Sequence, residues 1–74
     1  MTRTLTVHGH RVRTATIRRF VAVAARRAEN GAVVSVSIEK RSDSVETLRT
    51  FIRRQGFHSS RFFVIVDTVT GETI

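Results

Sequence analysis

Arginine is the residue type in this sequence with the clearest capacity for binding chemistry. Residues 1–28 contain seven arginines and no aspartate or glutamate, whereas from Glu29 onward six cationic residues balance six acidic ones. The whole formal excess of +7 therefore belongs to the first 28 residues. Codon bias in a GC-rich genome would explain arginine in place of lysine, but not the absence of acids. A surface of this kind is typical of proteins that face a polyanion.

We expect that polyanion to be nucleic acid. A guanidinium neutralises phosphates and releases their counterions, and its fork also suits bidentate contact with phosphate or guanine. The chain has no Tyr or Trp, and places in a core can be found for all five phenylalanines (residues 20, 51, 57, 62 and 63), which disfavours a stacking platform for single strands. The prediction is contact with the phosphate backbone of duplex DNA or structured RNA, through Arg11, Arg13, Arg18, Arg19, Arg26 and Arg27.

Other site chemistry has weaker support in the sequence. His8-Gly9-His10 has a spacing seen in some zinc sites, with His58 as a third imidazole, but short histidine motifs arise often by chance. Ser59, Asp67 and the glutamates show no spacing typical of a nucleophile with its base, and the four glycines are isolated. We therefore expect no enzymatic activity, no metal site and no cofactor.

The alternative partner is an acidic protein. Small, arginine-rich sequences without other motifs resemble products of phages or mobile elements, many of which bind and modulate a host protein. A membrane partner is not expected, because no segment approaches the apolar length of a membrane span. The N-terminal region lacks the apolar run of a signal peptide, which predicts a cytoplasmic protein. Residues 1–74 form one domain without cysteine, whose core is marginal, so we also expect a homodimer.

Residues 14–31 are the stretch that must position most of these arginines. As a helix they would place Ile17, Phe20 and Val21 on one side and the arginines on the other. The alternative is a β-hairpin that turns at Asn30-Gly31, because both residues tolerate positive φ. We favour the helix, since paired arginines at 18–19 and 26–27 would put charge on both faces of a strand.

The remaining elements follow from periodicity and turn residues. Alternation predicts a strand at 3–7, a turn at 8–10 with a short strand or loop after it, and a strand at 32–39 with one wet face. Residues 43–55 carry an apolar stripe at helical spacing, with Asp43 as the start of a capping box. The apolar run within 61–67 is typical of a central strand. The predicted fold is α+β, a small two-layer sandwich of order β(β)αβαβ, with two helices packed on one face of a 3–4 stranded mixed sheet.

Overall fold

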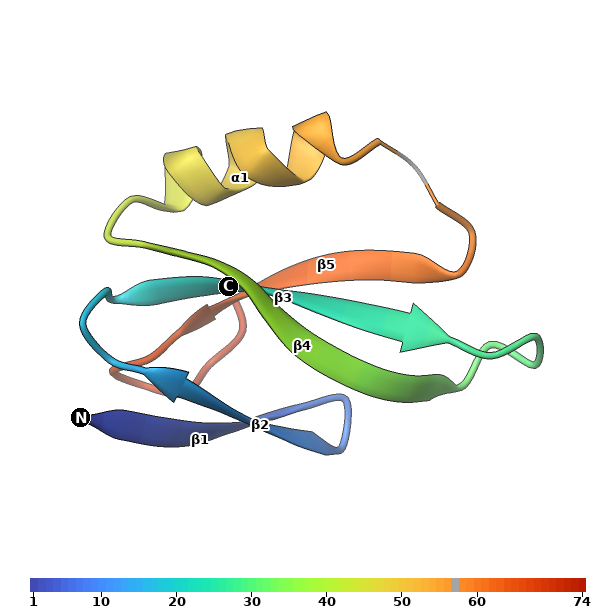
Figure 1. Cartoon of the computed structure of the whole chain (residues 1–74), viewed down its shortest axis with the longest axis horizontal. Coiled ribbons are helices and arrows are strands. Elements are labelled where there is room, and N and C mark those ends of the chain that lie inside the picture. The colour runs from blue at the N-terminus through green and yellow to red at the C-terminus, as the bar shows by residue number, and fades with distance from the viewer. Residues whose placement is uncertain (57) are drawn as a thin grey trace.

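The computed structural model describes residues 1–56 and 58–74, and within them it contains five strands and one helix (Figure 1). In chain order these elements are β1 (Thr2–Val7), β2 (His10–Ala15), β3 (Phe20–Arg27), β4 (Val33–Ser42), α1 (Val45–Arg54) and β5 (Arg61–Asp67). β1 and β2 form an antiparallel hairpin, and β4, β3 and β5 form a three-stranded antiparallel sheet with β3 in the centre.

The three-stranded sheet has a further layer of structure on each of its faces. The β1–β2 hairpin packs on one face, and α1 packs on the other (Figure 1). On the hairpin side, the buried residues are Leu5, Val7, Val21, Val23 and Val66. On the helix side, they are Ala22, Leu48 and Ile65. The molecule is therefore a three-layer arrangement of hairpin, sheet and helix.

The predicted helix at 14–31 is wrong, and the hairpin alternative is correct. This stretch forms the end of β2, a loop, the whole of β3 and the turn into β4, where Gly31 has a φ of 86°. Residues 21–25 are all 3% exposed or less, because the hairpin and α1 cover both faces of β3. The arginine pairs do not interrupt this buried run. Arg18 and Arg19 precede the strand, and Arg26 and Arg27 lie at its far end, where side chains of both faces reach solvent.

The predicted fold class is wrong for the same reason. The described residues contain one helix, all strand pairs are antiparallel, and there are three layers where two were expected. β5 is apolar on both faces, as expected, but it lies beside β3 and is not central. The C-terminal residues run along its other side, where the amide of Ile74 donates to the carbonyl of Ile65 at 2.8 Å.

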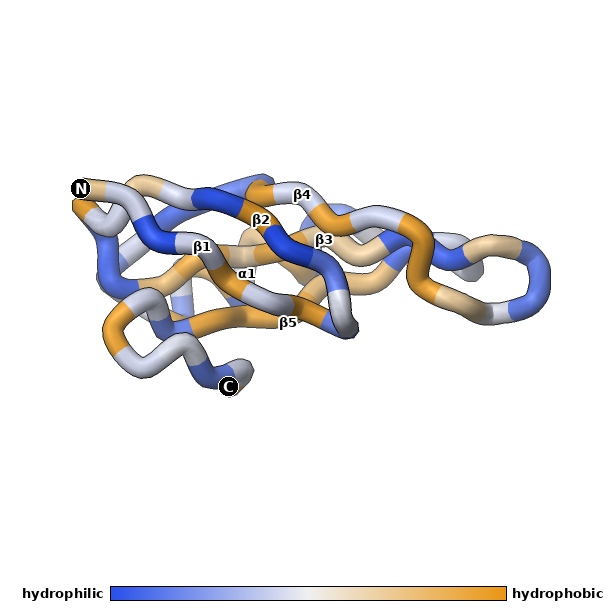
Figure 2. The backbone as a smooth tube through the Cα atoms, turned by 90° about the horizontal axis from the view of Figure 1, so that it is seen from below, coloured by the Kyte–Doolittle hydropathy of each residue, from blue (hydrophilic) through white to orange (hydrophobic). Residues whose placement is uncertain are grey.

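Several local predictions are confirmed. Residues 2–7 form a strand with Leu5 and Val7 buried, and residues 45–54 form a helix. Its N-cap is Ser44 and not Asp43, since the Ser44 side chain accepts from the amide of Thr47. Of the two alternatives for the segment after the first turn, the strand is correct, and Figure 2 shows a hydrophobic segment of β2 between hydrophilic ones. The core place expected for Phe57 lies outside the described residues.

The wet face of β4 is also confirmed. Ser35 and Ser37 lie opposite Arg26 and Ala24 of β3, so these serines point to the helix side of the sheet, where they are exposed. The apolar contacts of α1 are made with β3 and β5. The helix side of β4 therefore remains polar and open to solvent. No helix in the described part of the chain is long and apolar enough to cross a membrane.

Candidate functional site

The six arginines predicted to bind nucleic acid do not share one helical face. The structure divides them into three pairs at different places: Arg11 and Arg13 on β2, Arg18 and Arg19 in the β2–β3 loop, and Arg26 and Arg27 at the end of β3. Each pair has a different environment, and this environment decides whether its charge is free to meet a ligand.

Arg18 and Arg19 form ion pairs with carboxylates of the same chain. Arg18 Nη1 lies 3.0 Å from Asp43 Oδ2, and the amide of Arg19 donates to Asp43 Oδ1 at 2.8 Å. The Arg19 side chain donates through Nη2 and Nε to Asp67 Oδ2, at 3.0 and 3.3 Å. The hydrogen bond from the Arg19 side chain is the main cause that lowers the pKa of Asp67. These two arginines fix the β2–β3 loop to the start of α1 and the end of β5.

Two arginines outside the predicted set are structural as well. Arg3 Nη1 donates to the backbone carbonyls of Thr68 and Val69, at 2.6 Å each, and so ties β1 to the turn after β5. Arg41 Nε donates to the hydroxyl of buried Thr14 at 2.9 Å, which joins β4 to β2. Part of the positive charge that the sequence concentrates near its start therefore stabilises the fold.

Arg11 and Arg13 lie on the outer face of the hairpin. In the β1–β2 register they stand opposite Thr6 and Thr4, and both arginines are exposed. Arg13 Nη2 donates to the hydroxyl of Thr2 at 3.0 Å. The hairpin sequence contains no acidic residue, so this face presents threonine hydroxyls and two cations.

Arg26 belongs to a second cluster that includes a residue not predicted from the sequence. Arg26 and Arg61 are directly opposite each other in the register of β3 and β5. Together with His58 and Ser60 they line a cavity of about 290 Å³, which we call the Arg26–Arg61 notch. Within residues 1–56 and 58–74, no acidic side chain forms an ion pair with either arginine. Sequence reasoning missed Arg61 because it was counted among the balanced charges after residue 28. The sequence feature that could have drawn attention to Arg61 is its position at the start of an apolar strand.

Arg27 points to the opposite face of β3 and contacts an aromatic ring. Its guanidinium carbon lies 4.2 Å from the ring centroid of Phe62, which is half-buried. The His8 ring meets Phe62 edge-on, with centroids 5.1 Å apart and an interplanar angle of 88°. We call Arg27, Phe62 and His8 the Arg27 stack. Phe62 therefore has a role beyond the core place expected for it, because it supports an exposed cation.

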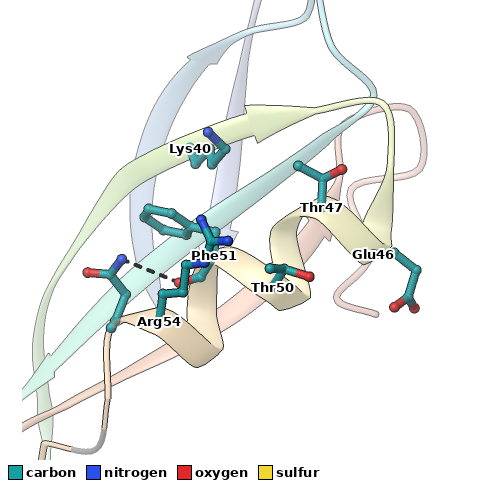
Figure 3. Close-up of a pocket in the computed structure, with 7 residues that line it drawn as sticks. Lys40, Glu46, Thr47, Thr50, Phe51 and Arg54 are labelled. Atoms are coloured by element: carbon teal, nitrogen blue, oxygen red, sulfur yellow. Dashed lines mark hydrogen bonds between the residues drawn. The ribbon is translucent and has the colours of Figure 1, made fainter.

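A larger groove runs between β4 and α1 (Figure 3). Its volume is about 400 Å³, and its lining residues are Lys40, Glu46, Thr47, Thr50, Phe51, Arg54 and Gln55. Lys40 Nζ lies 5.6 Å from the centroid of the Phe51 ring. Glu46 pairs with Arg49 at 2.8 Å and points away from Lys40 (Figure 3). The groove therefore presents two cations, Lys40 and Arg54, on the helix side of the sheet.

The histidines are not arranged as a metal centre. In the part of the chain that the structure describes, no three His, Cys, Asp or Glu side chains gather as a metal site requires. His8 packs on Phe62, and His10 Nε2 lies 2.8 Å from the carbonyl oxygen of Val33.

Comparison with known proteins adds no relative: no protein-family model, no curated protein and no solved structure matches this chain.

Proposed function

We propose that this protein binds nucleic acid through its phosphate backbone, with the Arg26–Arg61 notch as the primary contact. The observation that carries the proposal is the direct opposition of Arg26 and Arg61 on neighbouring strands. Like charges directly opposite each other destabilise a β-sheet. A phosphate between the two guanidinium groups would remove this repulsion and accept hydrogen bonds from both. His58 and Ser60 line the same notch, and their side chains are of types that donate to phosphate oxygens.

The distribution of the other cations without ion pairs favours a polymeric ligand over a single small anion. Arg27 follows Arg26 along the chain, and the groove between β4 and α1 adds Lys40 and Arg54. The longest dimension of the molecule is 35 Å. This equals about ten phosphates of one strand at the spacing of B-form DNA. Several phosphates can therefore meet the protein at once, and each contact releases counterions.

The test is fluorescence anisotropy with a labelled 20-nucleotide single strand and the matching duplex, from about 50 to 200 mM salt. Log affinity should fall linearly with log salt for the wild-type protein. The notch variant is Arg26→Ala with Arg61→Ala. Loss of two phosphate contacts should reduce the magnitude of the slope by about 1.4 on single strands and about 1.8 on duplex.

The matched control is Arg49→Ala with Arg53→Ala on α1, which lowers the net charge by the same amount. Both residues are exposed, and their side chains bond to Glu46 and Thr50 of the same helix. The control should retain most of the wild-type slope. An equal effect of both double variants would mean that only net charge matters and would remove the notch as a site. No binding by the wild type at 50 mM salt would contradict the proposal and favour an acidic protein as the partner.

A further inference from the structure

Among the described residues, Arg27 is closer to an aromatic ring than the other arginine that contacts one without an ion pair, Arg61, whose guanidinium carbon lies 5.2 Å from the Phe63 ring centroid. The guanidinium of Arg27 is 4.2 Å from the Phe62 ring centroid, well within the range of a cation–π contact. The backbone beneath it is held as well, since the amide of Arg27 donates to the carbonyl of Ser60 at 2.7 Å. His8, from the turn of the hairpin, packs perpendicular to the Phe62 ring. Two other segments of the chain, the hairpin turn at His8 and the stretch from Ser60 to Phe62, therefore support Arg27 directly or through the Phe62 ring.

A guanidinium held on an aromatic ring still has a second flat face. Arg27 is exposed, and none of the ion pairs in the described residues includes its side chain. Arginine planes stack on nucleobases, and single-stranded nucleic acids are recognised by stacking of this kind. Because Phe62 already orients the guanidinium, little side-chain freedom remains to be lost when a base stacks on it. A base can therefore stack on the face of the Arg27 guanidinium that is turned away from Phe62.

The Arg27 stack lies beside the Arg26–Arg61 notch, and this position determines which kind of nucleic acid can contact both sites at once. Arg26 and Arg27 are successive strand residues, so their side chains project to opposite faces of β3. The two sites meet at Ser60, which lines the notch and whose carbonyl accepts from the amide of Arg27. A flexible strand that curves around this end of the sheet can place a phosphate in the notch and its neighbouring base on Arg27. Bases within a duplex are stacked on each other and cannot reach Arg27.

We propose that the protein selects unpaired nucleotides, and that one base stacks on the exposed face of Arg27. This inference rests on the proposed nucleic-acid binding and names its ligand as single-stranded DNA or RNA, or an unpaired loop. It also revises the expectation that stacking on single strands is disfavoured, which assumed that all five phenylalanines serve only the core.

The experiment compares two labelled 12-nucleotide probes of equal charge, an ordinary single strand and an abasic strand that lacks the bases. Wild-type protein should bind the ordinary strand at least about five-fold more tightly, which is the low end of the effect of one base stack. Arg27→Lys keeps the charge but loses the planar group. In this variant the ratio of the two affinities should approach one, while the salt dependence stays as in the wild type.

The control is Arg26→Lys, which keeps the charge of the notch and should leave the ratio of the two affinities unchanged. Circular dichroism checks that both lysine variants fold. Equal binding of ordinary and abasic strands by the wild type would overturn the stacking proposal and leave backbone binding intact, and so would a ratio that Arg27→Lys does not alter. Failure of both probes to bind at 50 mM salt would overturn backbone binding, and the stacking proposal with it.

Discussion

Reversal of one charge in the Arg26–Arg61 notch should stabilise the fold while it weakens nucleic-acid binding. In Arg26→Glu, a carboxylate replaces the guanidinium directly opposite Arg61, so a repulsive cross-strand pair becomes an attractive one. Cross-strand charge pairs change stability by about 0.2–1 kcal/mol. For a change of about 0.5–1 kcal/mol in a domain of this size, Tm should rise by about 2–8 °C. Most surface substitutions change the free energy of unfolding by no more than about 0.5 kcal/mol in either direction.

The assay is thermal unfolding followed by circular dichroism at neutral pH, at low salt and again at 1 M salt. The rise in Tm should shrink at 1 M salt, where the Debye length is only about 3 Å. Arg11→Glu is the matched control, because it makes the same change of charge on a strand where the facing residue is Thr6. A fall in Tm for Arg26→Glu, or an equal rise for Arg11→Glu, would refute the repulsion on which the proposed function depends.

Two further predictions concern the packing of α1 and the loop that Arg19 secures. Leu48→Ala should cost about 2–5 kcal/mol in the free energy of unfolding measured with urea, because Leu48 is the residue of α1 that is fully buried. A loss below about 1 kcal/mol would show that α1 does not depend on this contact. The pKa of Asp67 is lowered in the folded state, chiefly by the hydrogen bond from Arg19, so its contribution to stability is present above the unfolded pKa of about 3.9 and is lost as pH falls through the folded value. Acidification from pH 5 to pH 2 should therefore destabilise the wild type more than Asp67→Asn, and equal losses in urea titrations would contradict the assigned role of Arg19.

Local patterns in the sequence were sufficient for β1, β4 and α1, each of which has one covered face and one wet face. Leu5 and Val7 alternate with threonines, and this alternation predicted a strand with its apolar side turned inward. The apolar stripe and the acidic first turn of residues 45–54 predicted α1 in the same way. The concentration of arginine near the start of the chain was also visible in the sequence. Which of these arginines pair with carboxylates within the fold was not. Arg18 and Arg19 bind carboxylates 25 and 48 residues away in the sequence, and no local pattern indicates such partners.

Only the tertiary structure decided the conformation of β3. Alanine and arginine are strong helix formers, so residues 20–27 taken alone favour a helix over a strand. The hairpin covers Val21 and Val23, and α1 covers Ala22, so both faces of this segment are buried by elements distant in the sequence. Burial on both faces favours a central strand, and it outweighs a helix propensity of a few tenths of a kcal/mol per residue. The sequence by itself therefore determined the charge, the helix at 45–54 and the half-exposed strands β1 and β4. The tertiary structure placed Arg26 opposite Arg61 and Arg27 on Phe62, because those pairs exist only once β3 lies beside β5.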